Sequence, residues 1–201
     1  MLNELRASSV LFVILFVVTG VIYPLVTWQT AQKLFPYQAN GSLIEENGKI
    51  IGSELIGQSF VAEKYFHPRP SAAQYGFVAG VMRDGYDASN SSGSNLAPTS
   101  AELIKAIGER ASALKSLSAD APFPVDLVTS SASGLDPHIS PDAAKIQSGR
   151  VAAVRHLDVA QVKDLIEQAT EPRTLGLIGD ERVNVLKLNR ALDLLASTTP
   201  Q

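Results

Sequence analysis

The hydrophobic pattern divides the chain into an apolar beginning and a mixed remainder. No charged side chain occurs from Ala7 to Gln32. A helix of that length, rising about 1.5 Å per residue, spans about 39 Å and exceeds the roughly 30 Å hydrocarbon core of a bilayer. A tyrosine and the single tryptophan fall near its far end, where aromatic rings favour the headgroup layer. The pattern predicts a transmembrane helix over about residues 8–30, within an N-terminal segment of residues 1–34.

A cleavable signal peptide is the alternative interpretation of this stretch, because it also places apolar residues after a basic one, here Arg6. The apolar run is longer than the roughly 7 to 15 residues of a signal peptide, and no Ala-x-Ala site follows it. An anchor is therefore the favoured interpretation. Arg6 precedes the span and only Lys33 follows it closely, so the positive-inside rule favours an inner N-terminus and an outer remainder.

The span offers no proton relay or ion-binding carboxylate, because it contains no Asp, Glu, Lys, Arg or His. Gly20 and Pro24 lie one turn apart, and small residues allow helices to approach closely. We expect these two positions to contact partner helices. An ordinary anchor is the alternative, since glycine and proline are common in membrane helices.

Residues 35–201 are long enough for one soluble domain with its own core. Local patterns and capping residues predict alternating strands and helices, which indicate a mixed α/β (α+β) fold. The predicted elements are a hairpin of Ser42–Glu46 and Lys49–Ile51 around Asn47-Gly48, a helix of 99–117 after a Thr99-x-x-Glu102 capping box, a strand of 124–129, a helix beginning at Ser140-Pro141, a helix from Asp158 to Ala169, a strand of 182–186 and a helix of 188–196.

One stretch, from Tyr65 to Pro98, has no hydrophobic period and is rich in glycine, serine and asparagine. Loops of this length in compact domains are usually binding segments or disordered ones. We predict a loop over residues 66–98 and expect Arg69 and Asn95 within it to contact partner proteins.

Composition excludes several classes of function. The chain has 17 Lys and Arg against 20 Asp and Glu, with a net charge of −3 and no basic run, which argues against nucleic-acid binding. Zero cysteines exclude disulfides, thiol catalysis and cysteine metal sites. The three histidines are far apart and lack metal-ligand spacing, so no metal site is expected.

Ser131 to His138 brings a serine, an aspartate and a histidine together within a short stretch. A nucleophilic hydrolase uses these residue types, but triads are assembled from separated segments, and no G-x-S-x-G elbow occurs here. A membrane-anchored extracytoplasmic serine hydrolase with Ser133 as its nucleophile is the alternative function. We predict no catalytic residues for the favoured interpretation.

Phosphate binding is a closer question, although neither a G-x-x-x-x-G-K-[ST] loop nor a G-x-G-x-x-G turn is present. The segment from Thr129 to Gly134 follows a predicted strand and is rich in small hydroxyl residues, so its backbone N–H groups could face an anion. A hydrogen-bonded turn is the alternative. The candidate nucleotide-binding residues are Thr129, Ser130, Ser131, Ser133 and Gly134.

Several segments together resemble the C subunit of the bacterial potassium-transporting P-type ATPase, the KdpC family. The matching segments are Gly52–Phe60, Tyr65–Ala72, Ser92–Thr99, Asp126–Pro141, Gln147, Arg150–Ala152, Arg155 and Gly179–Asn189. The departures are small: Ala132 stands where the family often has glycine, and Arg190 is more charged than is usual there.

The resemblance implies a single-pass subunit of the cell inner membrane, with its soluble domain periplasmic if the N-terminus is inside. It implies three partners, a K+-channel-like subunit, a P-type ATPase subunit and a small membrane peptide. It also implies a non-catalytic chaperone that raises the pump subunit's affinity for ATP, a cofactor shared with that subunit. A periplasmic domain could not touch cytoplasmic ATP, so nucleotide contact at Thr129–Gly134 and partner contact near Arg69 and Asn95 are alternative mechanisms within one family.

Overall fold

The computed structural model describes residues 1–73, 85–115 and 122–198. The chain separates into two compact units, residues 1–53 and residues 54–201. The boundary expected after residue 34 coincides with the end of a helix inside the first unit, and as a domain boundary it stays a prediction.

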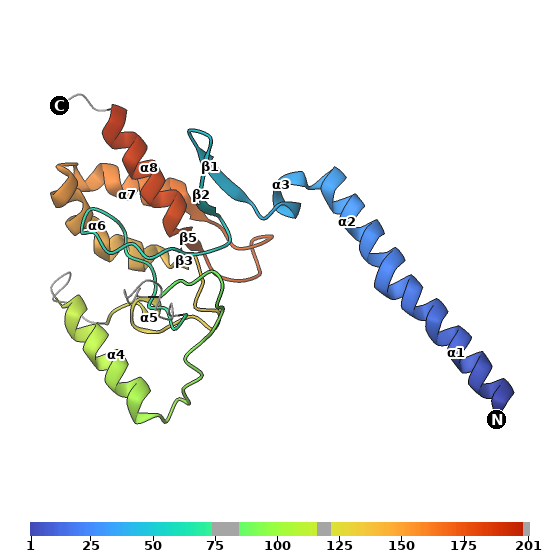
Figure 1. The fold of residues 1–201 in the computed structure, drawn as a ribbon. Helices are drawn as coiled ribbons and strands as arrows, with labels where there is room; N and C mark the ends of the chain where they lie inside the picture. Colours follow the sequence, from blue (N-terminus) through green and yellow to red (C-terminus); the bar gives the residue numbers. More distant parts are fainter. Residues whose placement is uncertain (74–84, 116–121, 199–201) are drawn as a thin grey trace, which may run out of the picture. The chain divides into compact units, whose positions relative to one another are not determined.

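The first unit begins with a continuous helical run, drawn in blue in Figure 1. It comprises α1 (Leu2–Val17), the π-helical turn η1 (Val18–Ile22) and α2 (Tyr23–Leu34). Among the described residues, this run is the one helix long and apolar enough to cross a membrane. Its apolar side chains are exposed within the unit, except for the half-buried Ala31, as expected of a surface that faces lipid or partner helices.

A short helix and a hairpin complete the first unit. Helix α3 (Pro36–Ala39) precedes β1 (Leu43–Glu46) and β2 (Lys49–Ser53), which pair antiparallel. Asn47 and Gly48 both have positive φ, 50° and 75°, as a type I′ turn requires. The predicted hairpin is therefore confirmed.

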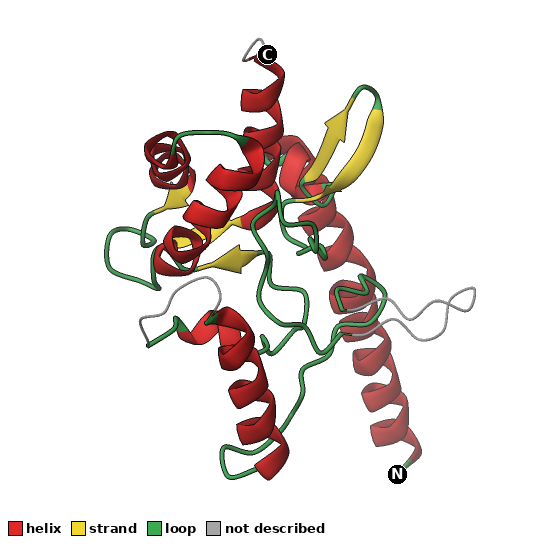
Figure 2. Cartoon of the chain, turned by 90° about the vertical axis from the view of Figure 1, so that its left-hand side faces the viewer, coloured by secondary structure: helices red, strands yellow, loops and turns green. Residues whose placement is uncertain are grey.

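The second unit is a mixed helix and strand domain, as predicted (Figure 2). Its strands form one antiparallel sheet in the order β3-β5-β4, and its helices lie around that sheet. The elements are α4 (Ala101–Leu114), α5 (Val125–Val128), β3 (His138–Ile139), α6 (Pro141–Arg155), α7 (Val159–Ala169), β4 (Thr170–Glu171), β5 (Arg182–Asn184) and α8 (Val185–Thr198).

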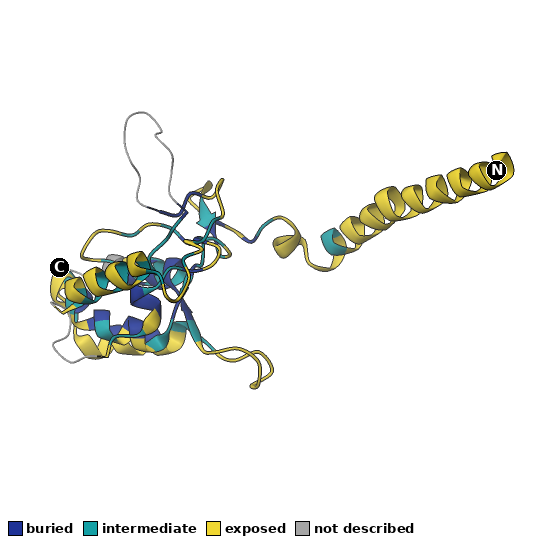
Figure 3. Ribbon diagram, turned by 90° about the horizontal axis from the view of Figure 1, so that it is seen from below, coloured by how far each residue is buried: buried dark blue, intermediate teal, exposed yellow. Residues whose placement is uncertain are grey.

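The core of this unit lies among α6, α7, α8 and β5 (Figure 3). Alanines on the inner face of α6 allow neighbouring elements to approach closely, and branched residues fill the remaining space. The fully buried side chains include Phe66, Val151, Val162, Ile166, Val183, Leu188 and Leu192. Phe66 belongs to the long loop predicted over residues 66–98, and its burial attaches the start of that loop to the core.

Two helix starts were predicted correctly from their caps. The Ser140 hydroxyl accepts a hydrogen bond from the Ala143 N–H at 3.1 Å, and Pro141 occupies the first turn of α6. Asp158 and Gln161 form a reciprocal capping box at the start of α7. Both signals involve neighbours in sequence, which explains why they could be recognised without the fold.

The predicted strand of 124–129 is wrong, because Val125–Val128 form the short helix α5. Pro124 adopts an extended conformation before the turn, and the Thr129 hydroxyl donates back to the Val125 carbonyl at 2.7 Å. The Asp126 carboxylate accepts from the Ser140 N–H at 2.6 Å. A tertiary hydrogen bond therefore joins this turn to the start of α6, which alternation of residue types could not reveal.

Some element boundaries also differ from prediction. Ser100, not Thr99, caps α4, through a 3.4 Å bond from the Leu103 N–H, and the predicted end at 117 lies outside the described residues. The strand predicted over 182–186 ends at Asn184, because its side-chain oxygen accepts from the Lys187 N–H at 3.1 Å and begins α8 there. The loop predicted over 66–98 is confirmed for residues 66–73 and 85–98, and its remaining residues lie outside the described part.

Candidate functional site

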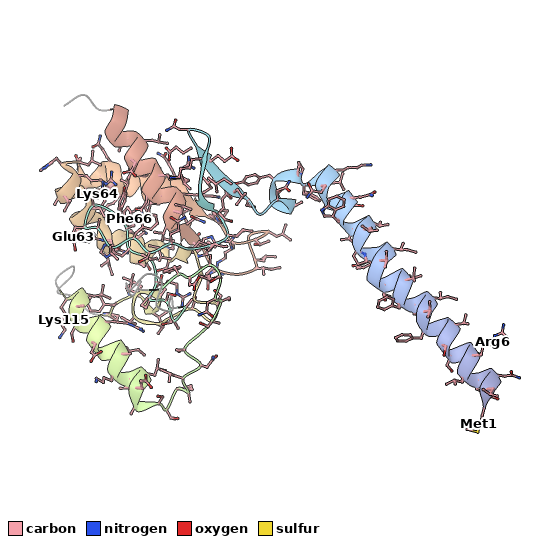
Figure 4. The ribbon with its side chains drawn as sticks, viewed as in Figure 1. Met1, Arg6, Glu63, Lys64, Phe66 and Lys115 are labelled. Carbon is pink, nitrogen blue, oxygen red and sulfur yellow. The ribbon has the colours of Figure 1, made fainter. Side chains whose placement is uncertain are left out.

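An irregular segment, residues 62–70, lies against the helical core and is called the strap below (Figure 4). It begins with a turn, in which the Tyr65 N–H donates to the Ala62 carbonyl at 3.0 Å. Two buried side-chain amides hold it. The Asn189 amide accepts from the Phe66 N–H at 2.8 Å and donates to the Phe66 carbonyl at 3.0 Å. The Gln147 amide does the same for His67, at 2.8 and 3.1 Å. Each amide thus takes the place of a neighbouring β-strand for one residue of the strap.

Two arginines of α6 bind the carbonyls that precede this pair. Arg150 donates to the carbonyls of Glu63 and Tyr65, the latter at 3.0 Å, and Arg155 donates to that of Lys64 at 2.6 Å. Arg155 also pairs with Asp193 of α8 at 2.8 Å. The strap backbone is therefore fixed at every residue from Glu63 to His67.

The strap places Arg69 against a carboxylate from the segment before β3. Arg69 Nη1 lies 2.8 Å from Asp136 Oδ2, and both side chains are about three-quarters buried. The other carboxylate oxygen accepts from the His138 N–H at 3.0 Å and lies 3.4 Å from His138 Nδ1. Burial alone would raise the pKa of Asp136, but the hydrogen bonds from His138 and Arg69 and the Arg69 charge hold it below its usual value.

Tyr86 closes this cluster from the other described end of the long loop. Its hydroxyl donates to the Arg69 carbonyl at 2.9 Å and lies 3.4 Å from the Asp136 carbonyl. Burial, and then the Asp136 charge, raise the pKa of Tyr86 above its usual value, so the phenol stays a donor. Gly57 packs beneath the ring, where a Cβ would lie only 2.3 Å from a ring carbon.

The candidate nucleotide loop, Thr129–Gly134, is folded into a hydrogen-bonded turn. The Ser131 hydroxyl accepts from the Gly134 N–H at 2.9 Å, and the Ser133 hydroxyl accepts from the Leu135 N–H at 3.1 Å. The Gly134 carbonyl accepts from the Ser71 hydroxyl at 2.6 Å. The last backbone donor of the candidate loop, the Gly134 N–H, and the donor that follows it, the Leu135 N–H, therefore already have partners.

Close backbone packing surrounds this turn. Gly134 has φ of +68°, and a Cβ there would lie 2.4 Å from the Ser92 carbonyl oxygen and 2.6 Å from the Ala73 Cβ. A Cβ on Gly93 would lie 2.7 Å from the Ala132 carbonyl oxygen. The two ends of the long loop and the serine-rich turn thus form one tightly packed assembly.

The structure brings some predicted site residues together and separates others. Arg69 forms an ion pair with Asp136, which follows the turn closely in sequence. Ser130 is half-buried within the turn. Asn95 is exposed in a left-handed conformation, with φ of 52°, and has no hydrogen bond to Arg69 among the described residues. The expected partner contacts of Arg69 and Asn95 stay predictions.

The geometry does not assemble a serine hydrolase from Ser131–His138. Within the described part of the chain, both serine hydroxyls are acceptors in the turn, and neither is hydrogen-bonded to His138. His138 instead faces Asp136, whose other oxygen binds Arg69. The described residues also contain no group of three His, Asp or Glu side chains able to hold a metal ion.

A cavity of about 500 Å³ lies between the strap, α4 and α5. Its lining contains no carboxylate among the described residues and combines apolar side chains with His67, Arg69 and Arg110. Arg110 donates to the Val128 carbonyl at 3.0 Å. Burial, and then the nearby Arg150 charge, lower the pKa of His67, so it is neutral at pH 7.

In the first unit, Gly20 and Pro24 lie on either side of a change in helix geometry. Gly20 is within η1, where the Tyr23 N–H donates to the Val18 carbonyl five residues earlier. Pro24 follows in the first turn of α2 and has no N–H to donate. A Cβ on Gly20 would make only an ordinary 3.8 Å contact with Phe16, so the chain's own helix does not require glycine there.

A family model and many related proteins match almost the whole chain. The family model described as K+-transporting ATPase, c chain, matches residues 5–194. The chain belongs to the KdpC family. Its relatives include potassium-transporting ATPase KdpC subunits of Methylobacterium nodulans, 50% identical over 199 residues (98% of this chain and 99% of the relative), and of Methylococcus capsulatus, 49% identical over 197 residues (97% and 100%). That of Mycobacterium bovis is 48% identical over 198 residues (97% and 100%).

Gln147 and Asn189 lie in the segments that resemble KdpC, but their structural role was not predicted from the sequence, and Tyr86 was not predicted as a site residue. A usable signal was present for the two amides. Gln147 lies four residues from Ala143 and from Val151, and Asn189 lies beside Leu188, so both occupy core-facing positions of helices. A polar residue at such a position must find a partner. The identity of that partner required the fold.

Proposed function

We propose that the chain is a non-catalytic accessory subunit of an ATP-driven potassium uptake complex. The match to subunits of that name runs from the apolar helix to α8 and covers almost all of both chains, which is the observation that carries the proposal. The expected partners are a K+-channel-like subunit, a P-type ATPase subunit and a small membrane peptide. The ion path and ATP hydrolysis then belong to those chains.

The described polar groups agree with an accessory role. Arg69, Asp136, His138 and Tyr86 bind one another and the backbone, so they stabilise a shape rather than present a reactive group. The apolar helix carries no Asp, Glu, Lys, Arg or His between Ala7 and Gln32. In the part of the chain that the structure describes, neither unit therefore offers a site for pumping by itself.

We further propose that the chain crosses the inner membrane once and that its second unit is periplasmic. Arg6 before the span and a single nearby Lys33 after it favour this orientation. Any effect on the pump subunit's affinity for ATP would then pass through partner subunits. Nucleotide binding at Thr129–Gly134 is the alternative, and it requires an anion to displace the Ser131 and Ser133 hydroxyls from the Gly134 and Leu135 N–H groups.

Co-purification and ATPase kinetics test the accessory role. A tag on the C-terminus of the full chain should recover the channel-like and pump subunits from detergent extracts of cells that express the whole complex. A complex prepared without this chain should show lower potassium-stimulated ATPase activity and a higher KM for ATP. Recovery of the chain alone, together with unchanged ATPase kinetics in its absence, would refute the proposal.

The absence of native cysteine gives a clean test of orientation. Ser91 is exposed in the second unit, and Asn3 is exposed before the span. With Ser91→Cys, an impermeant thiol reagent should label intact cells, whereas Asn3→Cys should be labelled only after the cells are broken. The reverse pattern would place the second unit in the cytoplasm and leave the nucleotide loop as the mechanism.

Docking of the span is tested at Gly20. Gly20→Leu should reduce recovery of the polytopic partners, because a large side chain prevents close helix approach. Val21→Leu, at the next position, is the matched control and should leave recovery unchanged. Equal recovery with both variants would show that Gly20 serves an ordinary anchor.

A further inference from the structure

The connection between β4 and β5 carries an unusual group of exposed aliphatic side chains. Leu175, Leu177 and Ile178 are 87%, 83% and 65% exposed, and they are called the apolar tip below. Figure 3 shows this connection as an exposed loop that extends from the core of the second unit. Single exposed leucines are common on soluble proteins, but three within four residues at the end of a loop indicate an interaction surface.

The loop that carries the apolar tip is closed by its own hydrogen bonds. Thr174 and Ile178 exchange backbone hydrogen bonds at 2.9 and 3.0 Å, and the Gly176 and Leu177 N–H groups donate to the Arg173 and Thr174 carbonyls at 3.0 and 3.2 Å. These four N–H groups could therefore be buried in an interface without losing a partner. The backbone is already in a shape suited to insertion.

The backbone conformation of Leu175 also indicates a binding surface. Leu175 has φ of 55° and Gly176 has φ of 74°, both in the left-handed region. That region is unfavourable for leucine because of its Cβ, and the exposed side chain gains no packing within this chain in return. Strained residues of this kind concentrate at binding sites, where a rigid shape lowers the entropy lost on association.

The charged side chains at the base of the loop form ion pairs, and these pairs help to distinguish a lipid partner from a protein partner. Arg173 pairs with Asp180 at 3.2 Å, Arg182 with Glu171 at 3.0 Å, and Lys187 with Glu171 at 3.6 Å. A loop that binds anionic lipid would carry unpaired cations, and one that rests in the bilayer interface would carry tryptophan or tyrosine. Residues 172–181 contain no aromatic residue. The three cations at this base, Arg173, Arg182 and Lys187, are thus all paired with carboxylates. An aliphatic tip above a base without an unpaired cation instead fits an apolar pocket of a protein.

We propose that the apolar tip inserts into an apolar pocket on a polytopic subunit of the potassium-transporting ATPase complex, outside the bilayer. The inference rests on the proposed function, which supplies such a subunit, and adds the surface by which the second unit contacts it. Exposed aliphatic side chains surrounded by paired polar groups have the arrangement of a protein interface, an apolar centre inside a polar rim. The tip then serves as a second attachment besides the membrane span.

Site-specific photo-cross-linking tests the contact in the whole complex. A photoreactive amino acid replaces Leu177 in one variant and Glu109, an exposed residue of α4, in the control. Irradiation of membranes that contain the complex should join position 177 to a polytopic subunit and leave position 109 without that product. A product with a second copy of this chain, with lipid alone, or no product at position 177 would overturn the inference.

Paired serine substitutions test the strength of the contact. Leu175→Ser with Leu177→Ser should lower retention of the polytopic subunits by about tenfold or more, as expected when two leucine side chains no longer leave water on binding. The circular dichroism spectrum should stay unchanged because both side chains are exposed. Ile104→Ser, at an exposed residue of α4, is the control and should retain the partners.

This experiment distinguishes failure of the proposed function from failure of the docking role of the apolar tip. If the unsubstituted chain retains no polytopic subunit, the proposed function is wrong. If the unsubstituted chain and the double serine variant retain the partners equally, the accessory role stands and the docking role of the apolar tip is wrong.

Discussion

Substitution of Gly134 by alanine should destabilise the second unit strongly. Two costs add at this position. The left-handed backbone, with φ of +68°, costs an alanine about 1–2 kcal/mol. The new Cβ would also lie 2.4 Å from the Ser92 carbonyl oxygen and 2.8 Å from the Ala73 nitrogen, and relief of such overlaps typically costs about 1–3 kcal/mol more. The expected loss in the free energy of unfolding is therefore about 2–5 kcal/mol.

A second glycine separates the two costs. Gly179 has φ of +79°, but a Cβ there would meet nothing within 4 Å. Gly179→Ala should therefore show the backbone cost alone, about 1–2 kcal/mol. Urea unfolding of the full chain in mild detergent, followed by far-ultraviolet circular dichroism, measures both variants, because α4 to α8 supply much of the helical signal outside the span.

The difference between the two variants is the decisive quantity. If Gly134→Ala and Gly179→Ala lose the same free energy, the serine-rich turn is not held by close packing against the long loop. A loose turn of that kind would also restore Thr129–Gly134 as a cradle for an anion. A larger loss at Gly134 shows that the turn is a packed structural element.

Three further changes test the core and the strap. Asn189→Leu should lower the free energy of unfolding by about 2–4 kcal/mol, since it leaves the buried N–H and carbonyl of Phe66 unpaired. An unchanged urea midpoint would contradict this role of the Asn189 amide. Gly149→Ala should raise the free energy of unfolding by about 0.5–1 kcal/mol, because a Cβ in the middle of α6 meets nothing within 4 Å and alanine favours the helix. A lower urea midpoint would show that neighbouring atoms crowd the added Cβ. The pKa of His67 is lowered in the folded chain, so the unfolded chain binds the proton first and stability should fall as pH drops below about 6.5. His67→Gln should flatten that part of the pH profile of the urea midpoint, and an equally steep profile in the variant would contradict the assignment.

The sequence predicted those elements whose signals are local. The turn at Asn47-Gly48, the cap of α6 at Ser140 and the capping box from Asp158 depend on residues within three positions of one another. Their geometry is decided before any tertiary contact forms. The apolar helix is the extreme case, because its length and composition alone define it.

Predictions failed where a distant group decides the local structure. The alternation in residues 124–129 suggested a strand, but the Asp126 carboxylate holds the Ser140 N–H and stabilises a helical turn. At the start of α4, two adjacent hydroxyl residues could both serve as caps, and the one nearer the helix, Ser100, does so.

The candidate site was only partly predictable for the same reason. Serine, aspartate and histidine are adjacent in sequence between Ser131 and His138, yet the Asp136 carboxylate is shared with Arg69, far away in the chain. The strap depends on side chains that lie 80 or more positions away in sequence, such as Gln147, 80 from His67, and Asn189, 123 from Phe66. Residue types at core-facing helix positions indicate that a partner exists, but only the fold identifies it.

The π-helical turn at Val18–Ile22 has a consequence for how the membrane helix can be recognised. One additional residue in a turn advances the helix by roughly 100° relative to a regular α-helix. A stripe of residues spaced four apart, such as Thr19, Tyr23 and Thr27, therefore does not continue straight through the turn. Side chains of α1 and of α2 therefore lie at azimuths that an uninterrupted α-helix would not give them, so substitutions that scan one face of the span must be chosen separately on each side of the turn.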